Sequence, residues 1–167
     1  MQQQRNNSFI YKVTLVAAVG GLLFGYDTAV IAGAIGFMQK YYNLSPAMMG
    51  WVASCALLGC IVGAMYAGTL SDKIGRKKVL MLSGILFAIS SVGTSMPPNL
   101  TFFVIFRLIG GMGIGIASML SPMYISEMAP ADIRGKLISV FQLGVVFGIL
   151  VIYFVNAGIA GIYDEAW

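Results

Sequence analysis

The sequence is poor in the residues from which most active sites are built. It has no histidine and two cysteines in 167 residues, and only 10% of its residues are charged, whereas a soluble domain carries about 25%. With no histidine, metal-ligand cluster or nucleophile–base pair, the sequence argues against an enzyme, and we expect no metal site and no cofactor. Cys55 and Cys60 are five positions apart, roughly 140° around a helix, which excludes a disulfide between them and favours a packing role.

Apolar residues, by contrast, make up 59% of the chain. Four runs of at least 19 residues contain no charge at all, at 41–71, 79–106, 108–126 and 137–163. Because about 20 apolar residues span a bilayer, each run predicts a transmembrane helix. The N-terminal stretch, interrupted only by Asp27, predicts a fifth. The expected fold class is therefore an all-α integral membrane protein with five transmembrane helices.

Proline and serine suggest where these helices begin and end. Ser45 followed by Pro46 is typical of a helix N-cap and first turn, and Pro122 and Pro130 are expected to bracket a cytoplasmic segment. Residues 1–8 are predicted to form a cytoplasmic tail, and residues 9–167 a partial helical bundle. The predicted helices cover about 9–38, 46–69, 77–95, 100–121 and 134–156.

The net charge of +4 is distributed unevenly along the chain. Eight of the ten basic residues lie at or before the start of the first helix, or in and beside the second and fourth connections. Under the positive-inside rule, this places the N-terminus in the cytoplasm and the C-terminus of the chain on the outer side of the cell inner membrane. The basic charge thus indicates orientation in a lipid bilayer, and no nucleic-acid partner is expected. The eight residues are Arg5, Lys12, Lys73, Arg76, Lys77, Lys78, Arg134 and Lys136.

Asp27 and Arg107 are the two charged residues that fall inside predicted membrane spans. A charge at a helix centre costs roughly 2.5–3.5 kcal/mol on insertion scales, so such residues usually have a partner or a function. Their predicted depths differ by roughly 6 Å, which long side chains can bridge. We therefore expect an ion pair. An ion or proton pathway is one interpretation, and a structural pair that only fixes helix packing is the other.

Small and polar residues on the predicted helices indicate two further features. Gly59-x-x-x-Gly63 and Gly111-x-x-x-Gly115 are typical of closely packed membrane helices. In the fifth helix, a polar stripe is expected to face either an aqueous cavity or a neighbouring helix to which it hydrogen-bonds. The stripe consists of Ser139, Gln142, Tyr153 and Asn156.

Three sequence motifs resemble those of a known family. The second connection, Gly68-Thr69-Leu70-Ser71-Asp72-Lys73-Ile74-Gly75-Arg76-Lys77-Lys78, resembles the signature loop of the major facilitator superfamily. Arg107 followed by Gly111, Gly113 and Gly115, and then Pro122-Met123-Tyr124, Glu127, Ala129-Pro130 and Arg134-Gly135, resembles its sugar porter branch. The first helix, from Gly20-Gly21-Leu22-Leu23-Phe24-Gly25 through Tyr26-Asp27-Thr28-Ala29-Val30-Ile31, is similar to the same branch.

The resemblance implies two six-helix bundles with a sugar site between them, and alternating access by rocking of one bundle against the other. It implies that Asp27 and Arg107 serve proton coupling, and that Phe24, Gln142 and Ile149 lie at the sugar site. Ile149 stands where a second glutamine is expected. It further implies conformational gating by a cytoplasmic group of residues, which are Gly68, Asp72, Gly75, Arg76, Glu127 and Arg134.

The length differs from that of the family, whose members have about twelve helices. The sequence therefore predicts the N-terminal part of a proton-coupled transporter for a pentose or hexose, with D-xylose among the candidates. The expected partners are the sugar, the proton, the bilayer and the missing C-terminal bundle. A passive sugar facilitator and a truncated, non-transporting membrane fragment are the alternatives, and Asp27 argues against the first of these.

Overall fold

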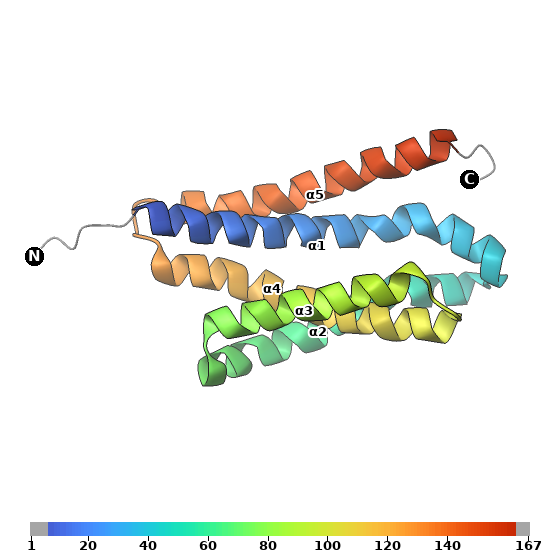
Figure 1. Cartoon of the computed structure of the whole chain (residues 1–167), viewed down its shortest axis with the longest axis horizontal. Coiled ribbons are helices and arrows are strands. Elements are labelled where there is room, and N and C mark those ends of the chain that lie inside the picture. The colour runs from blue at the N-terminus through green and yellow to red at the C-terminus, as the bar shows by residue number, and fades with distance from the viewer. Residues whose placement is uncertain (1–6, 163–167) are drawn as a thin grey trace, which may run out of the picture.

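The computed structural model describes residues 7–162 as five helices joined by short connections (Figure 1). All five contain segments long and apolar enough to cross a membrane, which confirms the predicted fold class. The start of α1, the α2–α3 turn and the α4–α5 connection lie at one end of the molecule (Figure 1). The helices are α1 (Asn7–Tyr42), α2 (Pro46–Ile74), α3 (Arg76–Ser95), α4 (Leu100–Met128) and α5 (Arg134–Ile162).

Side-chain caps fix the starts of α2 and α4. Ser45 has an extended backbone, and its hydroxyl accepts a hydrogen bond from the Met48 amide, with Pro46 in the first turn. This confirms the predicted N-cap. Asn99 caps α4 in the same way, accepting from the Phe102 amide at 2.8 Å. Each cap satisfies a backbone donor that the first helical turn leaves free.

The helices are longer than the sequence predicted. α1 begins at Asn7, inside the segment predicted as a tail, and ends at Tyr42 instead of near Met38, while α5 continues to Ile162. Residues 1–6 of that predicted tail lie outside the described part of the chain. Apolarity decides which residues cross the membrane, but a helix extends beyond the membrane until a backbone signal stops it.

The expected ends of α2 and α4 were wrong for this reason. α2 does not stop near Thr69 but continues to Ile74, so most of the predicted second connection is helical. Its end is Gly75, whose φ of 92° favours glycine. α4 passes through Pro122 to Met128, because one proline removes a single backbone donor and membrane helices tolerate this loss. Pro130, by contrast, favours an extended residue before it, and α4 ends there.

Two helix pairs cross at backbone contact through glycines. A methyl group on Gly63 of α2 would lie 2.2 Å from the Met112 carbonyl oxygen of α4, and one on Gly115 of α4 would lie 2.1 Å from that of Cys60. Together with Gly59 and Gly111, these residues confirm the predicted close packing.

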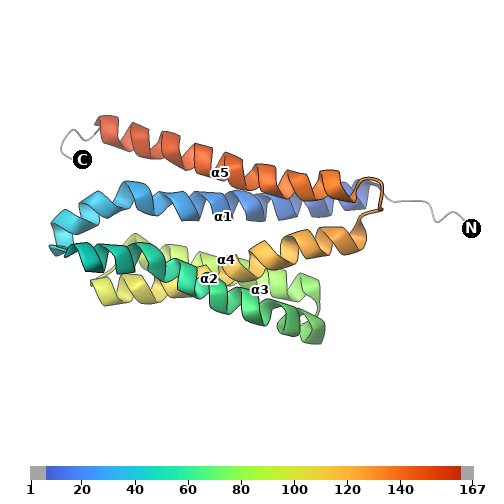
Figure 2. The same ribbon diagram turned by 180° about the vertical axis from the view of Figure 1, so that it is seen from behind.

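The second pair, α1 with α5, crosses in the same way and was not predicted. A methyl group on Gly25 would lie 2.0 Å from the Val145 carbonyl oxygen, and one on Gly148 would lie 2.1 Å from that of Leu22. The two helices lie side by side in both views (Figures 1 and 2). α3 packs on the other pair, where the Ser90 hydroxyl donates to the Phe106 carbonyl of α4 at 2.6 Å.

Candidate proton site and a second charge cluster

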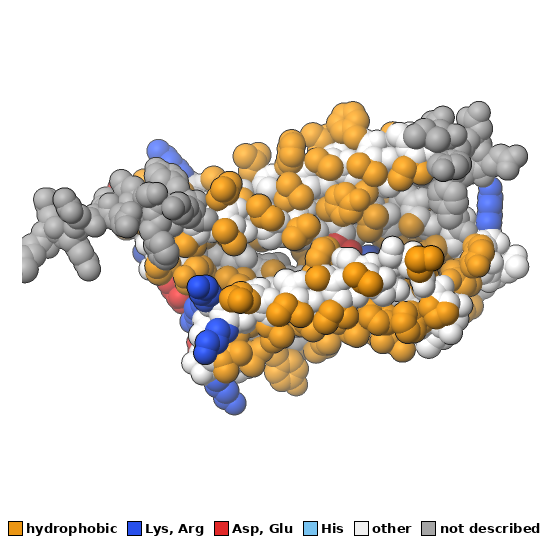
Figure 3. Space-filling view, viewed as in Figure 1, with side chains coloured by type: hydrophobic (Ala, Val, Ile, Leu, Met, Phe, Trp, Pro, Cys, Tyr) orange, Lys and Arg blue, Asp and Glu red, His pale blue; other side chains and the backbone are white. Residues whose placement is uncertain are grey.

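Asp27 of α1 and Arg107 of α4 form an ion pair inside the membrane-spanning region. Arg107 Nη1 donates to Asp27 Oδ1 at 3.0 Å, and only 7% of the arginine side chain and 20% of the aspartate side chain are exposed. The predicted pairing is confirmed. Red and blue atoms are visible in the middle of the otherwise apolar face that Figure 3 shows between α1 and α3.

Helix packing determines the positions of Asp27 and Arg107. The glycine contacts of α1 fix it against α5, and those of α4 fix it against α2, so both charged residues are carried by rigid helices. Removing one partner of a buried ion pair typically costs about 3–5 kcal/mol, because the other charge is left unpaired in a medium of low polarity. The pair therefore couples α1 to α4 for as long as Asp27 is charged.

Arg107 has a donor that this pair does not use. Its Nε is buried and has no hydrogen-bond partner among the described residues. On α2, which packs on α4 at Gly59 and Gly63, Cys55 is fully buried. The burial of Cys55 agrees with the packing role that the sequence predicts. The spacing of Gly59 and Gly63 was the sequence feature that indicated close packing of this face of α2 on α4, the helix that carries Arg107.

A second charge cluster lies where α2, α3 and α4 meet at the end that carries most basic residues. Arg76, the first residue of α3, bonds Asp72 Oδ1 at 2.9 Å through Nη1 and Glu127 Oε1 at 3.0 Å through Nη2. Arg76 also donates to the hydroxyl of Ser71, which the sequence did not suggest. The single-residue turn at Gly75 places Arg76 directly after α2, so its guanidinium reaches back to that helix.

Arg134 does not join this cluster, contrary to the expectation of a four-charge group. Its guanidinium donates to the Ala129 carbonyl oxygen at 3.3 and 3.4 Å, and within residues 7–162 it makes no ion pair with Asp72 or Glu127. Ala129 and Arg134 lie close together in the sequence, because α4 ends at Met128 and α5 begins at Arg134. The arginine therefore caps the end of α4, where carbonyls lack helical partners.

The residues expected at a sugar site lie in different environments. Gln142 of α5 is exposed, as a residue facing a partner bundle would be. Phe24 and Ile149 are partly buried and pack against one apolar core between α1, α4 and α5. The polar stripe of α5 is not uniform. Asn156 packs on α1, since a methyl group on Gly33 would lie 2.4 Å from its side chain.

Comparison with known proteins shows extensive similarity. A family profile described as "Sugar (and other) transporter" matches residues 13–167. The chain is 44% identical over 193 residues to the D-xylose-proton symporter of Escherichia coli strain K12, covering 100% of this chain and 39% of that protein. It is 46% identical over 158 residues to the arabinose-proton symporter of Bacillus subtilis strain 168, covering 93% of this chain and 34% of that protein.

The structural comparison agrees. A solved structure of the major facilitator superfamily proton:xylose symporter bound to 6-bromo-6-deoxy-D-glucose matches with a TM-score of 0.88 and 44% identity, covering 97% of this chain and 40% of that chain. This confirms that the five helices have the fold of part of a major facilitator transporter. The chain spans between 34% and 40% of the length of these three relatives.

Proposed function

This chain belongs to the sugar transporter family of the major facilitator superfamily, and from that premise we propose that it is the N-terminal part of a proton-coupled sugar transporter. The transporter works by alternating access, with the sugar bound between this bundle and a second one. The observation that carries the proposal is the buried pair of Asp27 and Arg107 at 3.0 Å. Its relatives include proton symporters for xylose and arabinose.

Asp27 is the proton-binding group in this proposal. When the aspartate takes up a proton it loses its charge, and the ion pair is reduced to a weaker hydrogen bond from the Arg107 cation to a neutral acceptor. α1 and α4 are then coupled less strongly. The free Nε of Arg107 gives the guanidinium a second direction in which to find an acceptor. A ligand shifts a conformational equilibrium by its differential affinity for the two states, and here the proton is that ligand.

The sugar is held partly by α5 and α1. Gln142 is exposed and offers both an amide donor and a carbonyl acceptor to hydroxyl groups. Phe24 supplies an apolar surface, and Ile149 occupies a position at which only apolar contact is available. The sugar proposed is a pentose or a hexose, with D-xylose among the candidates.

The proposal is tested by uptake in the full-length transporter from which this chain derives. Cells that express it should accumulate D-xylose, D-glucose or L-arabinose above the outside concentration, and a protonophore should abolish the accumulation. A passive facilitator would instead equilibrate the sugar, and the protonophore would have no effect. Accumulation that persists with the protonophore present would contradict proton coupling.

Ser71, Asp72, Arg76 and Glu127 form a cytoplasmic latch in this proposal. Gly75 positions Arg76, and Gly68 leaves space beside Met119 on α4. Arg134 supports the latch indirectly by holding the end of α4. Solvated surface charge is the alternative interpretation, because 67% of the Asp72 side chain and 43% of the Glu127 side chain are exposed.

Glu127→Gln should therefore shift the full-length transporter toward the inward-open state. Partly exposed ion pairs contribute about 0.2–1 kcal/mol, so the population ratio should change by up to about fivefold. The measurement is the distribution of distances between spin labels placed across the cytoplasmic face of the two bundles. The matched variant Glu127→Asp keeps the charge and should lie between the two. Identical distributions for all three proteins would identify the cluster as surface charge alone.

The basic residues at the latch end of the molecule support an orientation in the membrane, which is part of the proposal. Basic side chains gather at the end that holds the α2–α3 turn (Figure 3), and the positive-inside rule assigns that end to the cytoplasm. The C-terminal residues 163–167, predicted on the outer side, lie outside the described residues.

Cysteine labelling tests this topology. In a protein whose Cys55 and Cys60 are replaced with alanine, an impermeant thiol reagent added to intact cells should label Lys40→Cys and not Lys77→Cys. Both positions are exposed, so accessibility within the protein is matched. After the cells are permeabilised both should react. Labelling of position 77 in intact cells would invert the proposed orientation.

A further inference from the structure

Arg107 has a hydrogen-bond donor that the ion pair leaves without a partner. Its Nη1 donates to Asp27 at 3.0 Å, and only 7% of the arginine side chain is exposed. Its Nε is buried and unpaired, the one such side-chain nitrogen or oxygen in the described part of the chain. A buried donor left unpaired is unfavourable, so its presence in a folded protein needs an explanation. The side chains around Arg107 therefore show which group can accept from Nε.

Arg107 lies on the side of α4 that faces α2. Two contacts between these helices bracket it. Phe103, four residues earlier, packs in one buried cluster with Val52, and a methyl group on Gly111, four residues later, would lie 2.1 Å from the Ala56 carbonyl oxygen. Positions four apart lie on one side of a helix. The arginine is therefore carried on the packed face between α4 and α2, although its ion pair is with α1.

Cys55 is the polar side chain that α2 brings to the same level. It lies between Val52, in the cluster just described, and Gly59, where a methyl group would lie 2.3 Å from the Leu108 carbonyl oxygen. Its thiol is fully buried and donates to the Val52 carbonyl oxygen at 3.2 Å within α2. Because that bond uses the thiol hydrogen, the lone pairs of the sulfur remain able to accept, weakly, from Nε.

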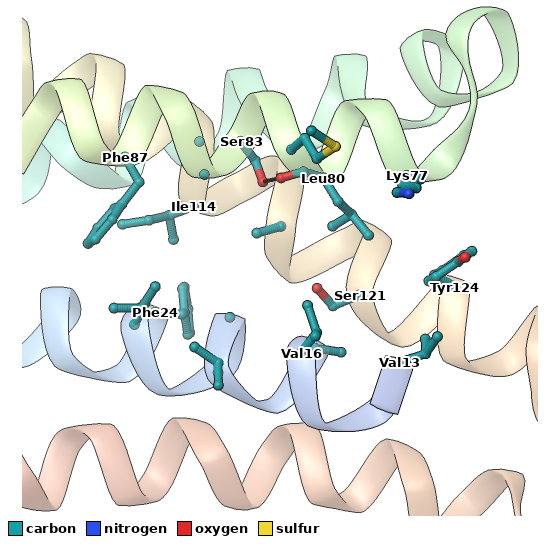
Figure 4. Close-up of a pocket in the computed structure, with 18 residues that line it drawn as sticks. Val13, Val16, Phe24, Lys77, Leu80, Ser83, Phe87, Ile114, Ser121 and Tyr124 are labelled. Carbon is teal, nitrogen blue, oxygen red and sulfur yellow. Dashed lines mark hydrogen bonds between the residues drawn. The ribbon is translucent and has the colours of Figure 1, made fainter. Parts of the chain in front are cut away.

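The groove of about 560 Å³ between α1 and α3 borders α4 on another side and brings no such acceptor to the ion pair. Of the residues that line it, Phe24 lies nearest to the pair along α1 and Gly113 along α4. The hydroxyl-bearing residues lie further along, from the middle of the groove to the end that holds Lys77, and are Ser83, Ser121 and Tyr124 (Figure 4). The end of the groove nearest Arg107 is therefore apolar.

Few titratable groups surround the guanidinium. α3 and α5 carry their charged residues in their first turns, at the end where α4 finishes, whereas Arg107 lies in the third turn of α4. Tyr153 of α5 is 58% exposed, and Tyr124 and Glu127 lie more than four turns further along α4. The groups that α1 and α2 bring to this crossing are Asp27, Cys55 and Cys60.

We infer that Cys55 is a positioning residue for Arg107: its sulfur accepts a hydrogen bond from Nε once protonation of Asp27 releases the guanidinium. The inference rests on the proposed role of Asp27 as the proton-binding group. The charged aspartate holds the arginine toward α1. The neutral acid holds it less strongly, and the cation, which stays buried, turns its free donor to the sulfur on α2. A contact made only in the protonated state favours that state, so Cys55 allows proton uptake at a higher external pH.

The dependence of sugar accumulation on external pH tests this role in the full-length transporter. Accumulation falls at alkaline pH as Asp27 ceases to be protonated, and Cys55→Ala should move this fall to lower pH by about half a unit, which corresponds to about 0.7 kcal/mol. Cys55→Ser keeps the size of the side chain and offers an oxygen, a stronger acceptor than sulfur, so the fall should stay at the wild-type pH or move higher. Ser54→Ala is the control and should not move it, because the Ser54 hydroxyl bonds the Gly50 carbonyl within α2 at 2.8 Å.

Exchange of labelled sugar, which needs no proton gradient, reports in the same cells whether each variant is folded and binds sugar. A cysteine that only packs would change exchange and accumulation in proportion at every pH and leave the position of the fall unchanged. That result for Cys55→Ala would overturn the inference, as would a shift to lower pH in Cys55→Ser or an equal shift in Cys60→Ala. A wild-type transporter without proton-dependent accumulation would refute the proposed function as well, whereas a coupled wild type with an unmoved Cys55→Ala profile refutes the role of Cys55 alone.

Discussion

Asp27→Asn in the full-length transporter should abolish accumulation of sugar against a gradient and leave sugar binding intact. Asparagine has nearly the shape of a protonated aspartic acid and keeps an oxygen that can accept from Arg107, so the 3.0 Å contact can persist as a hydrogen bond from the arginine cation to a neutral amide oxygen. It cannot gain or lose a proton at physiological pH. The measurement is uptake in energised cells together with exchange of labelled sugar across the membrane, which needs no proton gradient.

Two variants on the same helix serve as comparisons. Asp27→Glu keeps an ionisable group and should retain part of the uphill accumulation. Thr28→Val removes the neighbouring hydroxyl, which bonds the Phe24 carbonyl within α1 at 2.7 Å and has no part in the ion pair, so uptake should be unchanged. Undiminished uphill uptake by Asp27→Asn would refute the role of the aspartate.

The 167-residue chain alone should transport no sugar. The proposed site lies between two bundles, and here Gln142 of α5 is exposed with no opposite wall. The Asp27 side chain is also 20% exposed, so lipid would meet a charge there, an unfavourable arrangement. The measurement is proton-driven uptake of xylose and glucose by liposomes that contain the purified chain.

The matched preparation in that experiment is the full-length transporter at the same protein-to-lipid ratio. It should show saturable uptake that the chain lacks, and the chain should match empty vesicles. The chain is also expected to self-associate, recruit other helices or be degraded in cells. Saturable uptake by the 167 residues above the empty-vesicle level would show that a second bundle is not needed.

Two kinds of information were readable from the sequence. The charge-free runs predicted five membrane helices, because insertion depends on summed apolarity over about 20 residues and tolerates local exceptions. The ion pair of Asp27 and Arg107 was predictable because two opposite charges in one small bundle have few other ways to be satisfied. Neither inference needed an accurate helix end.

Predictions that depended on the conformation of a single backbone position or side chain were less accurate. Pro122 looked like the end of a helix, yet the helix continues to Met128, since the cost of one lost hydrogen bond is smaller than that of ending the helix there. Arg134 could reach either a carboxylate or a carbonyl, and it takes the nearby Ala129 carbonyl. Such alternatives differ by little energy, and tertiary geometry decides between them.

The crossing of α1 with α5 was missed for a different reason. Gly21-x-x-x-Gly25 and Gly144-x-x-x-Gly148 have the same spacing as the pair that was recognised. In α1 the motif lies next to Asp27, so one short stretch carries both a packing role and the buried charge. The spacing of glycines in all five helices predicts both crossings.

The most direct test of proton coupling at Asp27 is the external pH of lightly buffered, de-energised cells when sugar is added. Cells with the full-length transporter should remove protons from the medium together with the sugar, so the external pH should rise. Cells with the Asp27→Asn transporter, expressed at the same level and binding the sugar, should show no rise. A rise of equal size in the two would contradict the account, because the proton would then be carried by another group.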